Sequence, residues 1–174
     1  MEFVPTRRAA EPPFFFLSVM SRRSQVSAGI LVYRRRGGVE VLLAHPGGPF
    51  FKSRDAGAWT IPKGLPEAGE NLLTTARREF CEEMGVSVDG AFLELSPIQQ
   101  KGGKIVHAWA VECDLDLTQF RSNTFTMQWP PGSGRIAEFP EVDRAEFFAL
   151  DVAKKKINPA QVRLIEELER KLLR

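Results

Sequence analysis

Two mostly apolar runs near the start of the chain are typical of β-strands. The runs 26–33 and 39–44 are rich in β-branched residues, and Arg34-Arg-Arg-Gly-Gly38 between them is a turn-forming segment. This pattern predicts two antiparallel strands joined as a hairpin. Further strand-like runs lie at 88–95, 97–100 and 104–113, and Lys101-Gly-Gly-Lys104 predicts the turn of a second hairpin.

The spacing of apolar residues changes to that of a helix in the middle of the chain. We expect a helix over about residues 71–84, ended by Gly85, because glycine readily takes the left-handed conformation that closes a helix. Its inward face is predicted to carry Leu73, Ala76, Phe80 and Met84.

The last third of the chain is less regular. Residues 114–140 are expected to be mostly irregular, residues 146–150 predict a short last strand, and Asp151 is expected to cap a short helical turn. A final helix is predicted from Pro159 to Leu172, where four apolar residues recur at helical spacing: Val162, Ile165, Leu168 and Leu172.

Length and composition predict one globular domain. The chain has 174 residues, of which 43% are hydrophobic and 26% are charged, enough for one good-sized core. We place the domain at residues 25–174 and treat residues 1–24, with their prolines and three consecutive phenylalanines, as an N-terminal extension. The extension is either flexible or packed on the domain, where it could also support a dimer, and Met20 is an alternative start. The assembly is expected to be a monomer or a homodimer.

Charge and cysteine content limit the classes of binding partner and the cellular location that we expect. A formal net charge of +2 is too small to imply a specific nucleic acid partner, whereas an anionic small molecule remains compatible. The apolar run 12–20 is too short to span a bilayer and lacks a small-residue cleavage site, so we expect no membrane anchor and no signal peptide. Cys81 and Cys113 are expected to be buried free thiols, which favours a cytoplasmic location.

Three carboxylates share one side of the predicted middle helix. At helical spacing, Glu79, Glu82 and Glu83 fall within a sector of about 100°, offset from the apolar face. Like charges at this spacing repel one another, so the arrangement requires either water or a cation. A glutamate trio without further context is usually a solvated helix face. Oxygen ligands of this kind select Mg²⁺ or Mn²⁺.

The surrounding residues supply that context. The segment 64–86 reads Gly64, five residues, Glu70, seven residues, then Arg78-Glu79-Phe80-Cys-Glu82-Glu83-Met-Gly85-Val86. Every constrained position matches the Nudix box, and the chain therefore resembles the Nudix hydrolases. The resemblance implies an α/β fold, an α/β/α sandwich with a mixed sheet, β-hairpins and a C-terminal helix, and the predicted elements fit this order from about 25 to 173.

The resemblance also implies a reaction and a set of roles. Nudix hydrolases cleave a nucleoside diphosphate linked to another group X by attack of a metal-activated water. The implied ligands of a Mg²⁺ ion, or of Mn²⁺, are Glu79, Glu82 and Glu83, with the Gly64 carbonyl as a further possible ligand. Arg78 and Glu70 would form the ion pair that orients these carboxylates, although an ordinary surface pair is the alternative.

The general base is left open by the sequence. Family members take it from the box helix or from a glutamate on a distant loop. The candidate in the box is Glu79, and the candidates outside it are Glu141 and Glu138, just before the predicted last strand. The alternative for the outside pair is solvated loop charge.

Candidate substrate contacts lie on both sides of the box. Lys63 adjoins Gly64, so a phosphate contact is geometrically natural. Further candidates are Lys52 and Arg54 in the glycine-rich loop 45–57, Lys101 or Lys104 in the second hairpin turn, and Trp129 as an exposed stacking residue. For each of them the alternative is an ordinary surface position.

The segment 59–70 bears on the substrate. It matches the pattern W-x-x-P-K-G-x-x-E-x-G-E, which resembles diadenosine polyphosphate hydrolases and diphosphoinositol polyphosphate phosphohydrolases. Part of that group carries a tyrosine soon after the box, whereas the only tyrosine here is Tyr33. The first hypothesis is hydrolysis of a dinucleoside polyphosphate or related nucleotide, and the second is housecleaning hydrolysis of modified nucleoside triphosphates. A non-catalytic nucleotide-binding regulator is the hypothesis of another class.

Overall fold

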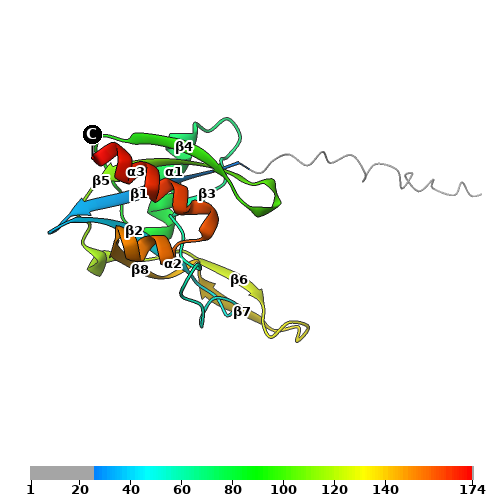
Figure 1. The fold of residues 1–174 in the computed structure, drawn as a ribbon. Helices are drawn as coiled ribbons and strands as arrows, with labels where there is room; N and C mark the ends of the chain where they lie inside the picture. The colour runs from blue at the N-terminus through cyan, green and yellow to red at the C-terminus, as the bar shows by residue number, and fades with distance from the viewer. Residues whose placement is uncertain (1–25, 174) are drawn as a thin grey trace, which may run out of the picture.

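A mixed β-sheet forms the centre of the fold, and helices cover both of its faces (Figure 1). The computed structural model describes residues 26–173, so the predicted N-terminal extension lies outside the described residues. The strand order is β4-β5-β1-β2-β8, in which β1 and β5 are parallel and the other neighbours are antiparallel. These strands are β1 (Val26–Arg35), β2 (Val39–Pro46), β4 (Leu93–Gln99), β5 (Ile105–Glu112) and β8 (Val142–Ala149).

The helices complete the predicted α/β/α sandwich. Helix α1 (Leu72–Met84) covers one face of the sheet, while α2 (Leu150–Lys156) and α3 (Val162–Leu172) cover the other. Alternation along β1 divides the core accordingly. Ile30 and Val32 pack toward α1, and Leu31 and Tyr33 pack toward the opposite cluster. The fold class is therefore confirmed, including both hairpins and the C-terminal helix.

The segment that precedes α1 fills a gap in the sheet. β1 pairs with β2 only near its C-terminal end, and nearer its N-terminus it pairs with the short strand β3 (Lys63–Gly64). The backbone N–H of Ile30 donates to the Pro62 carbonyl at 3.1 Å, and Ala44 exchanges two backbone hydrogen bonds with Thr60 at 2.9 Å. Residues 60–64 are thereby held within the sheet, and β3 at their end lies against α1.

Helix α1 has the predicted limits. The Asn71 side chain accepts a hydrogen bond from the Leu73 N–H at the start, and Gly85 ends the helix with φ of 72°. Ala76, Phe80 and Met84 are buried as predicted. At the start of the helix, Leu72 rather than Leu73 packs against the core, which places the inward face one position earlier there.

Residues 114–140 are more ordered than predicted. They contain the antiparallel hairpin of β6 (Thr124–Gln128) and β7 (Ile136–Pro140), together with a 3₁₀ turn, η2 (Leu117–Gln119). The hairpin projects from the sheet (Figure 1). Its signal is a short alternation in the run 124–129, Thr-Phe-Thr-Met-Gln-Trp, which the proline and glycine residues that follow it obscured.

Three smaller expectations about the elements were also wrong. Residues 88–92 are not a strand, and the runs around Pro97 form one strand, β4, with an irregularity between Leu95 and Ile98. This is consistent with proline lacking the N–H that a ladder needs. The last strand begins at Val142. Asp151 lies in the first turn of α2, whereas the cap position is Ala149 and has no side-chain hydrogen bond.

The remaining segments match the predictions more closely. The second hairpin turns through η1 (Lys101–Gly103), and a 3₁₀ turn, η3 (Pro159–Gln161), leads into α3.

Cys81 is exposed on α1, contrary to the expected burial, because it lies on the side of the helix away from the sheet. Cys113 is half-buried.

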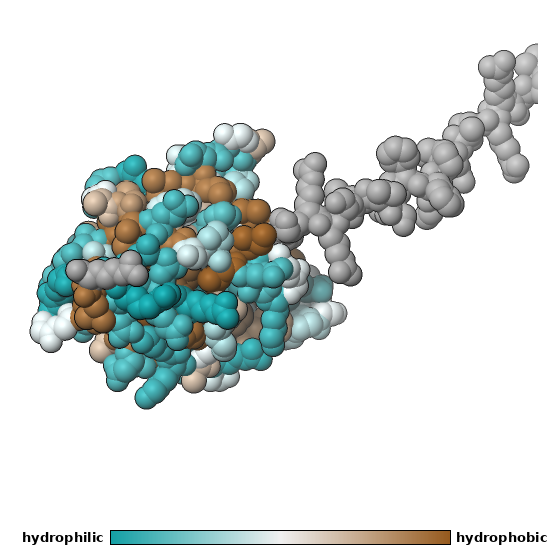
Figure 2. All heavy atoms as spheres, turned by 45° about the horizontal axis from the view of Figure 1, so that its top comes forward, coloured by the Kyte–Doolittle hydropathy of each residue, from teal (hydrophilic) through white to brown (hydrophobic). Residues whose placement is uncertain are grey.

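The length and polarity of the described helices decide whether any of them could cross a membrane. Over residues 26–173, every helix is too short or too polar to cross a bilayer. Hydrophilic residues cover much of the face drawn in Figure 2, with smaller apolar areas between them.

Candidate active site

The site is organised by one arginine on α1. The Arg78 guanidinium binds Glu70 through two parallel hydrogen bonds, from Nε to Oε1 and from Nη2 to Oε2, each 3.0 Å long. Glu70 also accepts from the Thr75 hydroxyl at 2.8 Å and the Glu67 N–H at 3.0 Å. Arg78, and then the Glu67 N–H, lower the pKa of Glu70 to about 2. The predicted ion pair is present, and its acidic partner is 13% exposed.

The same guanidinium reaches the box glutamates. Arg78 Nη1 lies 2.9 Å from Glu79 Oε1 and 3.2 Å from Glu82 Oε1, while Nη2 donates to the Leu65 carbonyl at 3.0 Å. Glu70 is the main cause of a raised pKa for Arg78. A planar fork of donors can hold several carboxylates at once, which an ammonium group cannot do.

At Gly64 the backbone lies directly against the carboxylate of Glu79. A Cβ atom built on Gly64 would overlap the carboxylate of Glu79, so only glycine allows this approach. The backbone at Gly64 does not require a left-handed conformation. The glycine is therefore needed for space rather than for its dihedral freedom.

Glu83 and Lys63 are neighbours beside Gly64, and both are half-buried. The Lys63 backbone N–H donates to Glu83 Oε2 at 3.3 Å. Burial raises the pKa of Glu83 and lowers that of Lys63. The negative charges of Glu141 and Glu79 further raise the pKa of Glu83, and the positive charge of Lys104 further lowers the pKa of Lys63. The predicted lysine thus lies among the carboxylates, accompanied by Lys104.

Glu141 is brought to the box by a relay of backbone hydrogen bonds. The Asn123 N–H donates to the Glu82 carbonyl at 3.1 Å, and the Glu141 N–H donates to the Asn123 carbonyl at 2.9 Å. Burial raises the pKa of Glu141, and the nearby Glu79 and Glu82 raise it further. Glu138 is not brought to the site in this way, because its carboxylate accepts the hydroxyl of Thr124.

The donor set suits a hard divalent cation. Within residues 26–173, no three carboxylate, imidazole or thiol groups converge closely enough to form a finished metal cage. Arg78 draws two of the carboxylates toward itself, and the Lys63 N–H binds the third. The residues nevertheless fit such an ion, because half-buried carboxylates that repel one another are stabilised by a shared cation and all the donors are oxygens.

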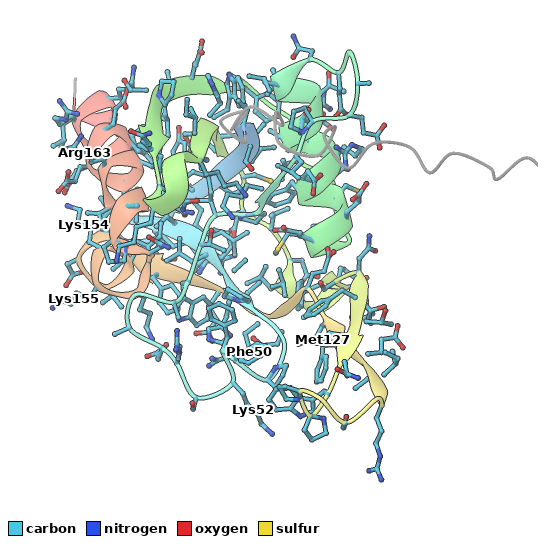
Figure 3. The ribbon with its side chains drawn as sticks, turned by 90° about the vertical axis from the view of Figure 1, so that its right-hand side faces the viewer. Phe50, Lys52, Met127, Lys154, Lys155 and Arg163 are labelled. Carbon is cyan, nitrogen blue, oxygen red and sulfur yellow. The ribbon has the colours of Figure 1, made fainter. Side chains whose placement is uncertain are left out.

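The other predicted contacts are scattered. Lys52 and Trp129 line a cavity of about 480 Å³ between the glycine-rich loop and the hairpin. Figure 3 shows Lys52 and Phe50 of the loop near Met127 of β6, far from Arg163 on α3. The Arg54 guanidinium lies 5.9 Å from the centre of the Phe51 ring and does not line this cavity. Lys101 is exposed in the hairpin turn.

A buried histidine was missed at the sequence level. His45 is fully buried, and its Nδ1 lies 2.6 Å from Asp143 Oδ1 while its Nε2 lies 2.7 Å from the Arg54 carbonyl oxygen. The only local sign is a histidine at the end of an apolar strand. Its partner is 98 positions away, so the sequence pattern alone could not pair them.

The comparisons with known proteins agree with this geometry. The family model described as NUDIX domain matches residues 23–168. The chain belongs to the Nudix family. It is a hydrolase that acts on pyrophosphate bonds.

Solved structures similar to this Nudix hydrolase share its fold. A C. elegans Ap4A hydrolase binary complex is 20% identical, with a TM-score of 0.61 over 84% of this chain and 98% of that one. The NUDIX domain of Shewanella oneidensis NrtR, complexed with ADP ribose, is 16% identical, with a TM-score of 0.60 over 87% and 90%. RenU, a Nudix hydrolase from M. smegmatis, is 16% identical, with a TM-score of 0.54 over 86% and 87%.

Proposed function

We propose that this chain is a divalent-metal-dependent pyrophosphohydrolase whose substrate is a dinucleoside polyphosphate or a related nucleotide. The observation that carries the proposal is the contact of one guanidinium with three carboxylates, those of Glu70, Glu79 and Glu82. Glu83 and Glu141 lie near this cluster, since Glu79 helps to raise the pKa of Glu83, and Glu79 and Glu82 help to raise the pKa of Glu141. Such an arrangement favours a cation and a polyanionic substrate over an ordinary helix surface.

Each residue of the site has a role in the proposed reaction. Glu79, Glu82 and Glu83, with the Gly64 carbonyl, would hold Mg²⁺ or Mn²⁺, which supplies phosphate charge neutralisation and a more acidic water. Lys63 and Lys104 would bind phosphate oxygens next to the carboxylates. The base would be Glu141 or Glu79, and the raised pKa of Glu141 is in the direction that strengthens a carboxylate as a proton acceptor.

The substrate class is supported by two observations. The run Trp59-Thr-Ile-Pro-Lys63 and the box that follows match the pattern associated with diadenosine polyphosphate hydrolases. The C. elegans structure with the same fold is named as an Ap4A hydrolase. Hydrolysis of modified nucleoside triphosphates is the second candidate, because the same phosphate-binding groups would serve it.

A direct test is hydrolysis of a substrate panel. Diadenosine and diguanosine polyphosphates, nucleoside triphosphates, ADP-ribose and NADH would each be incubated with Mg²⁺, with Mn²⁺ or with EDTA, and the products would be separated by chromatography. We expect the dinucleoside polyphosphates to be cleaved fastest and EDTA to abolish cleavage. Full activity in EDTA would contradict the metal dependence, and tight binding without turnover of any compound would favour the non-catalytic alternative.

The matched variants are Glu82→Gln and Glu138→Gln. Glu82→Gln should keep the fold but lose at least about 100-fold in kcat, because it removes a charged ligand. Glu138→Gln makes the same chemical change on a carboxylate whose one side-chain partner among residues 26–173 is Thr124, and it should leave kcat unchanged. Equal rates for the two variants would refute the assignment of Glu82.

A further inference from the structure

The cavity lined by Lys52 and Trp129 lies beside Glu141, the candidate base. It has a volume of about 480 Å³, within the range of small-molecule sites. The glycine-rich loop forms one side, and the β6–β7 hairpin with the start of β8 forms the other. The residues that line it are Gly48, Pro49, Lys52, Trp129, Phe139, Pro140 and Asp143. Pro140 is directly followed by Glu141, so the cavity and the candidate catalytic carboxylate share one short segment.

The loop and the hairpin are packed closely enough to fix the shape of the cavity. The Gly47 N–H donates to the Glu141 carbonyl at 2.9 Å, and a Cβ atom on Gly47 would overlap the Pro140 carbonyl. A Cβ atom on Gly48 would lie 3.1 Å from the Phe125 ring. These two glycines let the loop lie directly against the hairpin, so the cavity is preformed rather than left between two independent segments.

Aromatic side chains form the apolar wall. Trp129 packs edge-to-face against Phe50, with ring centres 5.4 Å apart, and Phe139 lies 6.0 Å from Phe125. Trp129 is half-buried, so part of its ring is available to a ligand. A flat, aromatic ligand is what such a wall recognises.

One carboxylate in the cavity is held in place from behind. The Arg54 carbonyl can only accept a hydrogen bond, so His45 Nε2 must carry a proton and donate it. His45 Nδ1 lies 2.6 Å from Asp143 Oδ1. This fully buried imidazole orients Asp143, whose other oxygen has no hydrogen-bond partner within residues 26–173.

The polar groups of the box and of the cavity suit different parts of a nucleotide. In the cavity, the Asp143 carboxylate accepts hydrogen bonds from N–H groups, while Lys52 lines the same cavity and the Arg144 Nε lies 3.6 Å from Asp143 Oδ1. At the box, Lys63 and Lys104 provide positive charge beside the carboxylates that would hold the cation. Because the cation and these two lysines would bind the phosphates, the aromatic wall of the cavity is left to the ring of the nucleotide.

The edge of the ring follows from the same carboxylate. Guanine presents two adjacent donors, N1–H and the N2 amino group, to an acceptor. Adenine presents one amino donor beside the N1 acceptor, which a carboxylate repels. We propose that this cavity binds the purine base of the substrate, stacked on Trp129, with the N–H edge of guanine donating to Asp143. This rests on the proposed function, whose phosphate chemistry it extends to the base.

The test measures binding without catalysis. Titration calorimetry would use GMP, AMP and ribose 5-phosphate with the full chain. We expect GMP to bind about tenfold more tightly than AMP and ribose 5-phosphate to bind more weakly than either. Trp129→Leu should weaken GMP binding roughly 5- to 150-fold, the range for loss of one stacked base, and Trp129→Phe should retain most of it.

Ile136→Ala is the matched control. Ile136 lies on the same hairpin, is 69% exposed and does not line the cavity, so its truncation should not change GMP binding. Equal affinity for GMP and AMP, or for GMP and ribose 5-phosphate, would overturn the proposal, as would an unchanged affinity in Trp129→Leu. If GMP binds as expected while no polyphosphate is hydrolysed, the proposed function fails but the base site stands. If hydrolysis proceeds while Trp129→Leu binds GMP normally, the base site fails alone.

Discussion

Replacing Gly64 by alanine tests the placement of Glu79 with the addition of one methyl group. The new Cβ would overlap the Glu79 carboxylate, and Gly64 has an ordinary backbone conformation that alanine can adopt. The group displaced is the end of a flexible side chain, so the fold can absorb the change. The site cannot, because the carboxylate must leave its position against the backbone.

The size of the effect follows from the displacement. Restoring ordinary van der Waals contact requires the carboxylate to move by about 1 Å or more, and a misplacement of about 1 Å at a reacting centre costs about 100-fold in rate. This corresponds to about 2.7 kcal/mol in activation free energy. The free energy of unfolding should change by less than about 1 kcal/mol, because alanine also restricts the unfolded chain.

The assay combines steady-state hydrolysis across a Mg²⁺ titration with thermal unfolding. Gly38→Ala is the control, because a Cβ atom at Gly38 meets no atom within 4 Å among residues 26–173 and its backbone is also compatible with alanine. We expect Gly64→Ala alone to lose activity while both variants unfold near the wild-type temperature. A wild-type rate for Gly64→Ala at every Mg²⁺ concentration would refute the reasoning.

Three further predictions concern the carboxylates around this position. Arg78→Lys should lower kcat about 10- to 100-fold, because an ammonium cannot keep the fork to Glu70 and also reach the other carboxylates; steady-state kinetics would check this, and an equal loss in the exposed control Arg77→Lys would contradict it. Glu141→Gln should lower kcat by about 10²- to 10⁴-fold if Glu141 is the base, whereas Glu138→Gln should not; if both are silent, the base lies in the box helix. The free energy of unfolding should fall as pH drops from about 4.5 toward about 2, because Glu70 is held ionised in the folded state and its stabilisation is lost on protonation. Urea unfolding over that pH range should show a smaller fall for Glu70→Gln, and identical slopes would argue against the ion pair as the cause.

The box helix could be predicted because its signals are local. The apolar spacing, the capping residue Asn71 and the terminal Gly85 all lie within one short segment, and each favours the same helix. The same holds for the first hairpin, where two strand-like runs flank a glycine turn. The pairing of Arg78 with Glu70 was implied by the resemblance to the Nudix box, and the structure contains it.

The hairpin of β6 and β7 was not predicted, because the contacts that stabilise it come from residues distant in the sequence. Its residues alternate over only a few positions, and every residue of its two strands is half-buried or exposed. Much of its packing comes from the glycine-rich loop, where Gly48 meets Phe125 and Phe50 meets Trp129. A segment stabilised mainly by such tertiary contacts has a weak local pattern.

The difference between the two sites follows from how each is assembled. A catalytic centre built on one helix and the turn before it can be recognised from a short motif, because the spacing along the chain fixes the geometry. The base cavity needs Lys52, Trp129 and Asp143 from three separate segments, and Asp143 is oriented by His45 from a fourth position. Reaction chemistry can therefore be inferred from the box alone, whereas selection of the base depends on contacts that exist only after folding. Substitutions in the cavity should accordingly change KM and base preference more than kcat, and substitutions in the box should do the reverse.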